Sequence, residues 1–343
     1  MRSEYTFDAT ADAPLEYWRN FSLQLQKEKD NGKFYLTEKV ENINWKIREI
    51  RHEEIQKIDE AHQVLHDYLF LVRKKNELRK NYDECVKTFE NYKTKIKGLK
   101  EPSFDQKKLE IDIYTEVNRV FTNFLSSFKS FIELNEMRIK REYKGPCNTP
   151  KQCKGKCKEC LHCKGDESCK EFKAFKKTTK YCYDKHFSYA FFYKLRNFAN
   201  HHFFPIERIH LSLAYLPNEE SEIEFYFDKK ILLHEKYKGA DIIKVANQHK
   251  STWDLYNNSF RVLPILLKIQ EPIKILSSEI FKIEEDRFTK ASNTLMKFYN
   301  EGNKKNRVVS IVQFSSNHSD SNTIRTDLIE EIRTIKQEAE ILF

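Results

Sequence analysis

The chain has 343 residues, and its 61 Lys and Arg stand against 52 Asp and Glu, which gives a formal net charge of +9. Aromatic residues make up 13% of the chain and supply material for a core, so the composition excludes disorder throughout. Only 7 Gly and 8 Pro occur, and neither G-x-G-x-x-G nor G-x-x-x-x-G-K-[ST] is present, which argues against an all-β sandwich, a Rossmann enzyme and a P-loop enzyme.

The first twenty residues carry acidic side chains and lack the apolar segment of an export signal. No run of about 18 apolar residues follows, so no membrane-spanning helix is expected. We therefore expect a soluble, cytoplasmic protein with no membrane partner. In a reducing compartment, clustered cysteines are metal ligands or free thiols more often than disulfides.

Residues 35–97 have apolar side chains at helical spacing and predict a long amphipathic helix, which could fold into a hairpin near residues 74–80. Two interpretations stay open, a coiled arm that binds a partner and a packing helix of a bundle. The stripe consists of Ile43, Ile47, Ile55, Ile58, Leu65, Leu69, Val72, Tyr82, Val86, Phe89 and Ile96.

A second helix is predicted over residues 106–140, with phenylalanines along one face and Gly145 and Pro146 marking its end. A segment rich in cysteine and lysine follows to about residue 180. A third helix is predicted over residues 185–203 and is stopped by Pro205. The apolar face of the second helix consists of Ile113, Val117, Val120, Phe121, Phe124, Phe128 and Phe131.

Beyond the third helix the apolar period changes to two, which predicts a β-hairpin. Helical patterns then resume and are interrupted near Pro264 and Pro272. The expected elements are strands at 209–215 and 223–227, a third strand at 231–233, helices within 253–300, a strand at 307–314 and a charged helix at 327–343.

Six cysteines lie within 23 residues, and the overlapping C-x2-C steps at Cys157, Cys160 and Cys163 suit a tetrahedral Zn²⁺ ion. We expect structural zinc, with Cys153 or Cys169 as the fourth ligand and Cys147 as a further candidate. The alternatives are an iron–sulfur cluster, free thiols or disulfides, and His162 is a further candidate ligand.

The same segment is strongly basic, because residues 138–180 hold 14 Lys and Arg against 5 Asp and Glu. This local excess of +9 equals the charge of the whole chain. A basic patch placed before the third helix would attract a polyanion, and we assign RNA contacts to Lys173, Lys176 and Lys177. The alternative is a solvated lysine loop without a partner.

The third helix contains Arg196-Asn197-Phe198-Ala199-Asn200-His201, an R-x4-H pattern with a polar residue after the arginine. The pattern resembles the signature of HEPN-domain proteins, and the preceding helix has Asn118-Arg119 and Asn123-Phe124-Leu125, which resemble segments of bacterial members. The resemblance covers residues 106–206. It implies a metal-independent ribonuclease on a helical bundle, of the kind found in toxin and anti-phage systems, with a composite site across a homodimer.

A helical wheel assigns roles along this helix at about 100° per residue. Phe187, Phe191, Leu195, Phe198 and His202 fall on one apolar face, so His202 is expected to pack in the core. Arg196, Asn200, Tyr189 and Tyr193 fall on the opposite face, where the two tyrosines would form a partner surface. His201 lies about 140° from Arg196, which favours a site completed by a second copy.

These residue types suit RNA cleavage without a catalytic cofactor. His201 can remove a 2′-hydroxyl proton, and Arg196 can hold the phosphate and stabilise its growing charge. Asn197 and Asn200 would orient the histidine or the phosphate, or else are surface amides. Tyr193 would stack on a base or donate a hydrogen bond, or else is a packing residue.

We expect a mainly α protein, a HEPN-like bundle with a zinc-binding insertion and a small α+β C-terminal part. The expected regions are the long-helix region 1–105, the HEPN-like core 106–206 with its insertion at 145–180, and the part 207–343. The predicted function is a homodimeric endoribonuclease that acts on RNA and has an antitoxin or regulatory protein as a candidate partner. The alternatives are a non-catalytic nucleic-acid-binding protein and a structural protein that acts through its N-terminal helices.

Overall fold

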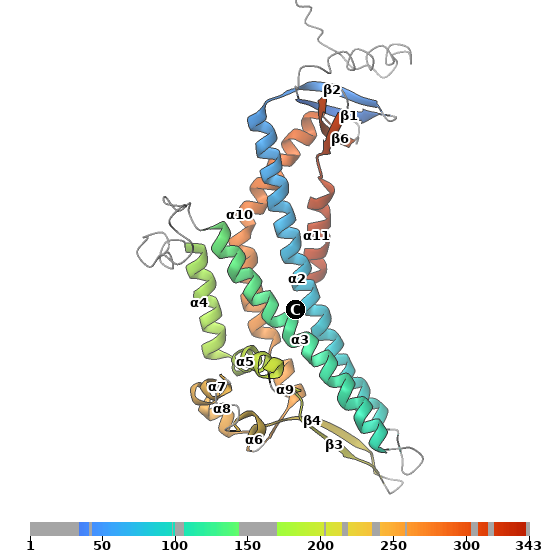
Figure 1. Cartoon of the computed structure of the whole chain (residues 1–343), viewed down its shortest axis with the longest axis vertical. Helices are drawn as coiled ribbons and strands as arrows, with labels where there is room; N and C mark the ends of the chain where they lie inside the picture. The colour runs from blue at the N-terminus through green and yellow to red at the C-terminus, as the bar shows by residue number, and fades with distance from the viewer. Residues whose placement is uncertain are drawn as a thin grey trace, which may run out of the picture. The chain divides into compact units, whose positions relative to one another are not determined.

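The described part of the chain is mainly helical and also contains small antiparallel sheets (Figure 1), as the sequence predicts. None of the described helices has a segment both long and apolar enough to cross a bilayer. The computed structural model describes residues 34–40, 43–97, 99, 106–143, 170–201, 204–214, 219–234, 241–257, 259–302, 308–314 and 319–340.

The chain divides into two compact units. Unit 1 consists of residues 1–69 and 286–334, and unit 2 consists of residues 70–285 and 335–343. The predicted boundaries at residues 105 and 206 both lie within unit 2, whereas the divisions after residues 69 and 285 fall inside two long helices. They are α2 (His52–Lys97) and α10 (Gln270–Gly302).

Unit 1 contains a four-stranded antiparallel sheet in the order β2-β1-β6-β7, next to the beginning of α2 (Figure 1). Thr37 pairs with Ser310, and its buried hydroxyl donates to the Ser310 carbonyl at 3.1 Å. The pairing of β1 with β6 therefore joins segments more than 260 residues apart in the sequence. The strands are β1 (Phe34–Val40), β2 (Ile43–Ile50), β6 (Val308–Phe314) and β7 (Ser319–Thr323).

The helix predicted from residue 35 is wrong over residues 35–50, which form β1 and β2. Ile43 and Ile47 are four positions apart, which fits a helix face, but Ile47 is the extra residue of a β-bulge and its side chain is exposed. Lys46 of β2 lies over the ring of Tyr35 in β1, with its ammonium 3.6 Å from the ring centroid. Cross-strand contacts of this kind stabilise a hairpin.

The helix α2 begins where Glu54 reaches back to the chain before it. Its carboxylate accepts from the Arg51 backbone N–H at 3.0 Å, as the third residue of a helix does in a capping box. The helix then continues without a break to Lys97, so the predicted hairpin near residues 74–80 is wrong. Unit 1 also holds most of α11 (Asp327–Glu340), whose bounds nearly match the helix predicted over residues 327–343. In the same unit the rings of Tyr68 and Phe288 stack with their centroids 4.4 Å apart.

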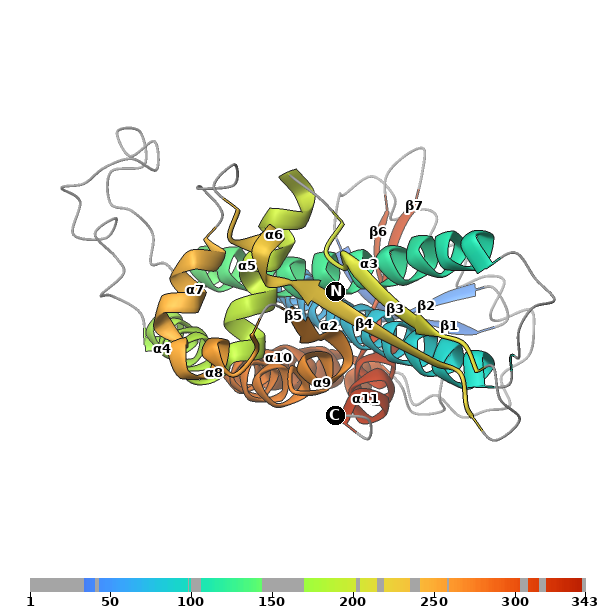
Figure 2. The same cartoon turned by 90° about the horizontal axis from the view of Figure 1, so that it is seen from below.

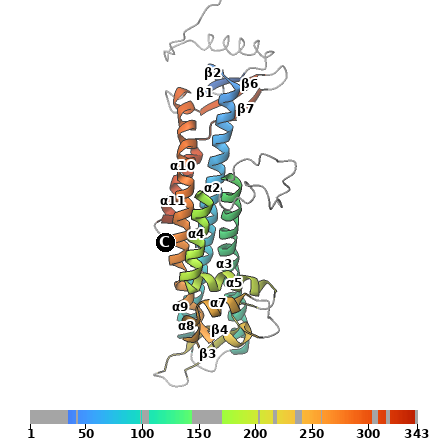
Figure 3. The same cartoon turned by 90° about the vertical axis from the view of Figure 1, so that its left-hand side faces the viewer.

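Unit 2 is built around α3 (Gln106–Glu142), whose predicted apolar face is fully buried. The helix α4 (Lys170–Lys185) contacts α3, and α5 (Phe187–His201) runs across both (Figure 3). The third predicted helix is thus confirmed as α5. The predicted cysteine- and lysine-rich segment extends too far, because residues 170–180 belong to α4.

The second sheet has the order β3-β4-β5 (Figure 2), and the predicted hairpin is confirmed with Ile209 opposite Phe225. Its strands are β3 (Arg208–Ser212), β4 (Glu222–Asp228) and β5 (Ser259–Arg261). The strand predicted at 231–233 is wrong, because the Asp228 carboxylate accepts from the Lys230 N–H at 2.8 Å and caps a short helix.

Short helices complete unit 2. Pro264 and Pro272 lie in the first turns of α9 and α10, where a missing N–H removes no intrahelical hydrogen bond. The prolines therefore mark the starts of two helices, and β5 lies within the region predicted to be helical. The short helices are α6 (Lys229–Leu232), α7 (Ile242–Gln248), α8 (Lys250–Asp254) and α9 (Val262–Leu267).

Candidate functional site

The helix α5 carries the predicted site and is anchored by aromatic packing. Phe191 packs against Phe227 of β4 at 5.1 Å and against Phe260 of β5 at 5.4 Å between ring centroids. Phe192 packs against Phe121 of α3 at 5.6 Å. Because these edge-on contacts come from three different elements, the rotation of α5 about its axis is fixed.

A buried asparagine fixes the chain that follows α5. The side-chain nitrogen of Asn118 donates to the Ile206 carbonyl, and its oxygen accepts from the Ile206 N–H, both at 3.0 Å. This two-point contact holds the backbone five residues after His201. The sequence drew attention to Asn118 through the family resemblance but gave it no role, because its partner is 88 residues away.

Arg196 is half-buried on α5, and its Nε atom is enclosed. No acceptor among the described residues bonds to that Nε atom. Leaving a buried donor unpaired costs about 1–3 kcal/mol, so the contacts of the described residues do not account for Arg196. The enclosed Nε atom is closed to a ligand, but the other two guanidinium nitrogens also have no described partner and can donate to a phosphate oxygen.

Asn197 faces a buried lysine of α3. The ammonium of Lys129 donates to the Asn197 side-chain oxygen and also lies 3.4 Å from the Glu133 carboxylate. Within the described ranges no partner bonds to the Asn197 side-chain nitrogen, which keeps its two donors. Lys129 was not predicted from the sequence to belong to the site. Its position directly after Phe128 of the apolar face indicates that it lies at the edge of the core.

The half-buried ring of Tyr193 is close to two ammonium groups, those of Lys129 at 5.3 Å and Lys194 at 5.5 Å from its centroid. Lys194 in turn pairs with Asp241 at 2.8 Å. Burial, and then the nearby carboxylates of Glu133 and others, raise the pKa of Tyr193. Its hydroxyl is therefore protonated at neutral pH and can donate a hydrogen bond.

Tyr189 does not form the exposed partner surface that the wheel predicts. It is buried, and its ring packs against Phe128 of α3 at 5.4 Å. The wheel describes α5 alone, whereas α3 covers the side on which Tyr189 lies. Of the two tyrosines, Tyr193 alone keeps partial exposure.

The predicted RNA-binding lysines lie on α4. Lys176 is paired with Glu136 of α3 at 2.5 Å, which neutralises part of its charge. Lys173 and Lys177 are exposed, and neither forms an ion pair with any residue that the structure describes. These two side chains are the ones available to a polyanion.

The structure does not describe the side chains of several predicted site residues. Asn200 and His201 belong to α5 but their side chains are not described, and His202 lies outside the described residues. Within those residues no group of His, Cys, Asp and Glu is arranged to hold a metal. The predicted ligands Cys147, Cys153, Cys157, Cys160, Cys163 and Cys169, with His162, also lie outside the described residues.

Cys85 and Cys182, which lie outside the cysteine cluster in the sequence, are buried. Burial raises the pKa of Cys182 to about 12 and that of Cys85 well above its ordinary value. A thiol with a raised pKa has almost no thiolate at neutral pH. Both thiols are therefore unreactive packing residues.

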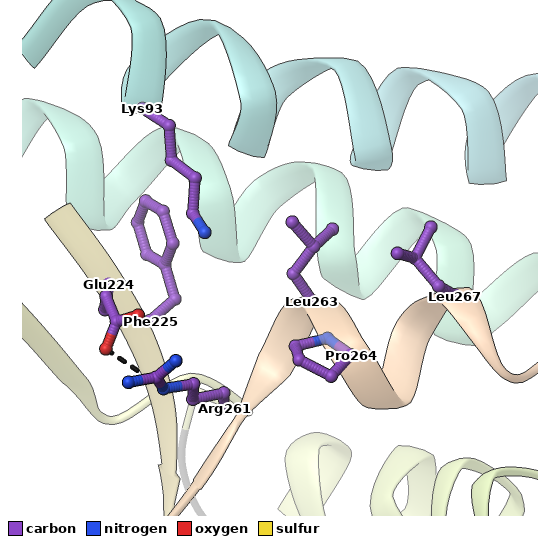
Figure 4. A pocket seen from close by; sticks show the side chains of 7 residues that line it. All are labelled: Lys93, Glu224, Phe225, Arg261, Leu263, Pro264 and Leu267. Atoms are coloured by element: carbon purple, nitrogen blue, oxygen red, sulfur yellow. Dashed lines mark ion pairs between the residues drawn. The ribbon is translucent and has the colours of Figure 1, made fainter. Parts of the chain in front are cut away.

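A separate pocket of about 200 Å³ lies between α2, β4 and α9 (Figure 4). The carboxylate of Glu224 accepts from Tyr226 and pairs with the Arg261 guanidinium at 3.1 Å, so these two charges neutralise each other. Phe225 and Leu263 are among its apolar walls. The pocket contains none of the predicted site residues.

Comparisons with known proteins gave no match to a family model, to a curated protein or to a solved structure. The HEPN resemblance therefore stays a prediction that rests on the motif of α5. The contacts of Arg196 and Asn197 are the structural observations that bear on the chemistry of this site.

Proposed function

We propose that this protein is a metal-independent endoribonuclease of the HEPN type. One observation carries the proposal: Arg196 and Asn197 are neighbours on an anchored helix, and each keeps hydrogen-bond donors without a described partner. Donors left unpaired beside the core favour an anionic ligand. The histidine that RNA cleavage requires, His201, follows on the same helix.

His201 acts as the general base in this proposal. It takes the proton of a ribose 2′-hydroxyl, and the 2′ oxygen forms a bond to phosphorus while the bond from phosphorus to the 5′ oxygen breaks. The products are a 2′,3′-cyclic phosphate and a 5′ hydroxyl, whose proton comes from solvent. An unperturbed histidine has a pKa near 6.5, which suits proton transfer near neutral pH.

Arg196 stabilises the phosphate in this proposal. Its planar guanidinium can donate two parallel hydrogen bonds to the non-bridging oxygens, where negative charge increases during in-line attack. Asn197 supplies an amide donor beside it, and Tyr193 supplies a half-exposed ring and a protonated hydroxyl. Asn200, on the same helix, is a further candidate donor. Lys173 and Lys177 on α4 attract the RNA backbone, with Lys176 as a weaker, paired contributor.

Zinc and a second subunit are further parts of the proposal. Cysteines between Cys147 and Cys169 would hold about one Zn²⁺ per chain and so order the basic segment. Metal analysis of protein purified without chelator tests this, and protein that lacks both zinc and iron would refute it. Mixing inactive Arg196→Ala and His201→Ala chains should restore partial activity if Arg196 and His201 act across a homodimer.

The direct test is incubation of the purified protein with single-stranded RNA in EDTA. We expect cleavage, with products that end in a 2′,3′-cyclic phosphate. Binding without cleavage would favour the alternative of a nucleic-acid-binding protein, for which the basic segment is the supporting observation. A protein that neither binds nor cleaves RNA would favour the alternative of a structural protein that acts through α2. There would then be no toxic activity for an antitoxin to regulate.

A further inference from the structure

We propose that Lys129 is a positioning residue of this site, which turns the amide nitrogen of Asn197 toward the phosphate of the RNA. The inference rests on the proposed function and adds to it a residue from another helix. Lys129 belongs to α3, 68 residues before Asn197, and the R-x4-H motif does not include it.

The hydrogen bond from Lys129 determines how the Asn197 amide is turned. An ammonium group has three donors and no acceptor, so it can bond only to the oxygen of an amide. The Asn197 oxygen therefore lies toward α3, and the nitrogen with its two donors lies on the other side. Without the Lys129 ammonium, the two orientations of the Asn197 amide would no longer be distinguished by a hydrogen bond to α3.

The donors that remain match the proposed substrate. The non-bridging oxygens of a phosphodiester only accept hydrogen bonds, so an amide that presents its nitrogen can bind them and one that presents its oxygen cannot. Asn197 directly follows Arg196 in the sequence, and the terminal guanidinium nitrogens of Arg196 also have no partner among the described residues. Two adjacent residues thus offer donors and no competing acceptor.

Lys129 also lies near the residue one turn earlier, whose ring helps to hold the ammonium in place. Tyr193, Asn197 and His201 are spaced by four, so they occupy successive positions of one row along α5. Lys129 contacts the first two, the ring of Tyr193 at 5.3 Å and the oxygen of Asn197. Its burial and its ion pair with Glu133 at 3.4 Å hold the ammonium in place.

A double-mutant cycle on RNA cleavage in EDTA separates positioning from a general effect on folding. We expect Asn197→Ala to lower kcat/KM about 100-fold and Lys129→Met about 10-fold, the sizes typical of lost transition-state donors. If Lys129 acts through Asn197, the double variant should equal Asn197→Ala alone. Effects that multiply to about 1,000-fold would overturn the inference.

Two further variants complete the experiment. Asn197→Asp keeps an acceptor for Lys129 but removes both donors, so it should melt at or above the wild-type temperature and still cleave at least about 10-fold more slowly. Lys75→Met is the matched control, because Lys75 is also a buried lysine of unit 2 beside an aromatic ring, Phe281 at 5.2 Å. Its kcat/KM should stay within about twofold of wild type.

The outcomes distinguish this inference from the proposed function. A wild-type protein that cleaves no RNA refutes the ribonuclease and this role of Lys129 with it. A wild-type protein that cleaves RNA, together with an Asn197→Asp variant of unchanged rate, refutes only the positioning role. A Lys75→Met variant as slow as Lys129→Met would also refute it, because loss of any buried lysine would then produce the effect.

Discussion

Two arginines, Arg48 of unit 1 and Arg196 of unit 2, have opposite surroundings. In unit 1, Arg48 of β2 donates to Glu54 at 3.0 Å and to Glu301 at 2.7 Å, so its guanidinium holds the sheet to two helices. In unit 2, the Nε atom of Arg196 is enclosed and has no described partner. The fold accounts for the first arginine, whereas the proposed function assigns the second to a phosphate of RNA.

The amide and imidazole groups repeat the contrast. His62 of unit 1 accepts from the Arg325 backbone N–H at 3.2 Å, and Arg325 pairs with Asp327 at 2.6 Å. Asn197 of unit 2 is paired through its oxygen and offers its nitrogen. In these two examples the polar side chains of unit 1 bond to other groups of the protein. In unit 2, Arg196 and Asn197 of α5 keep donors that the proposed function assigns to RNA.

The largest expected effect is on His201, at the end of the row along α5. His201→Ala should reduce RNA cleavage by about 100-fold to 10,000-fold, the range for a lost general base, with little change in stability. His202→Ala should mainly lower the melting temperature, because the wheel places it on the apolar face. Cleavage rates and melting curves of both variants test this assignment. A stable, inactive His202→Ala together with an active His201→Ala would show that His202 is the general base.

An intermediate effect is expected from the contact that fixes the end of α5. Asn118→Ala leaves the buried N–H and C=O of Ile206 without partners, so the free energy of unfolding should fall by about 2–4 kcal/mol. Denaturant titration measures this. Asn123→Ala, a change at an exposed asparagine of the same helix, should cost less than about 0.5 kcal/mol. Equal losses of stability at the two positions would show that the contact of Asn118 with Ile206 does not stabilise the protein.

The smallest expected effect belongs to unit 1 and depends on pH. Hydrogen bonds from Arg48, together with one from the Arg51 backbone, lower the pKa of Glu54 to about 2. The stabilisation is therefore complete above the ordinary pKa of a glutamate and is lost as the pH falls from about 4.5 toward 2. Glu54→Gln should lower the free energy of unfolding by about 1–2 kcal/mol at pH 7 and by almost nothing at pH 2.

The neighbouring glutamate provides the control for this prediction. Glu53 is exposed in the same first turn of α2, so Glu53→Gln should change stability by only about 0.5 kcal/mol. Hydrogen exchange in β1 and β2 would assign the effect to unit 1. A Glu54→Gln effect that persists at pH 2 would mean that it does not come from the ionised carboxylate.

Local patterns predicted the helices better than the sheets. The apolar face of α3 repeats every three or four residues, and each of its phenylalanines is buried. The pairing of β1 with β6 could not be predicted, because the contact of Thr37 with Ser310 leaves no local pattern. The spacing of Ile43 and Ile47 was misleading, because Ile47 is the extra residue of a bulge in β2 and is exposed, so it belongs to no apolar helix face.

The same limit applies to the candidate site. The motif identified Arg196 and Asn197 from one segment of the sequence, but their surroundings come from other elements. Lys129 reaches Asn197 from α3, and Phe128 of the same helix covers Tyr189. A wheel of one helix cannot show what its neighbours cover, and this is why Tyr189 was wrongly predicted to be exposed.

The most direct measurement is RNA cleavage by Arg196→Ala in EDTA, beside its melting curve. Because the Arg196 Nε atom is unpaired among the described residues, the variant should be at least as stable as wild type, while kcat/KM should fall about 100-fold to 1,000-fold. Arg325→Ala removes the same charge from unit 1 and should cleave within about twofold of wild type. Wild-type activity in Arg196→Ala, or an equal loss in Arg325→Ala, would contradict the central claim.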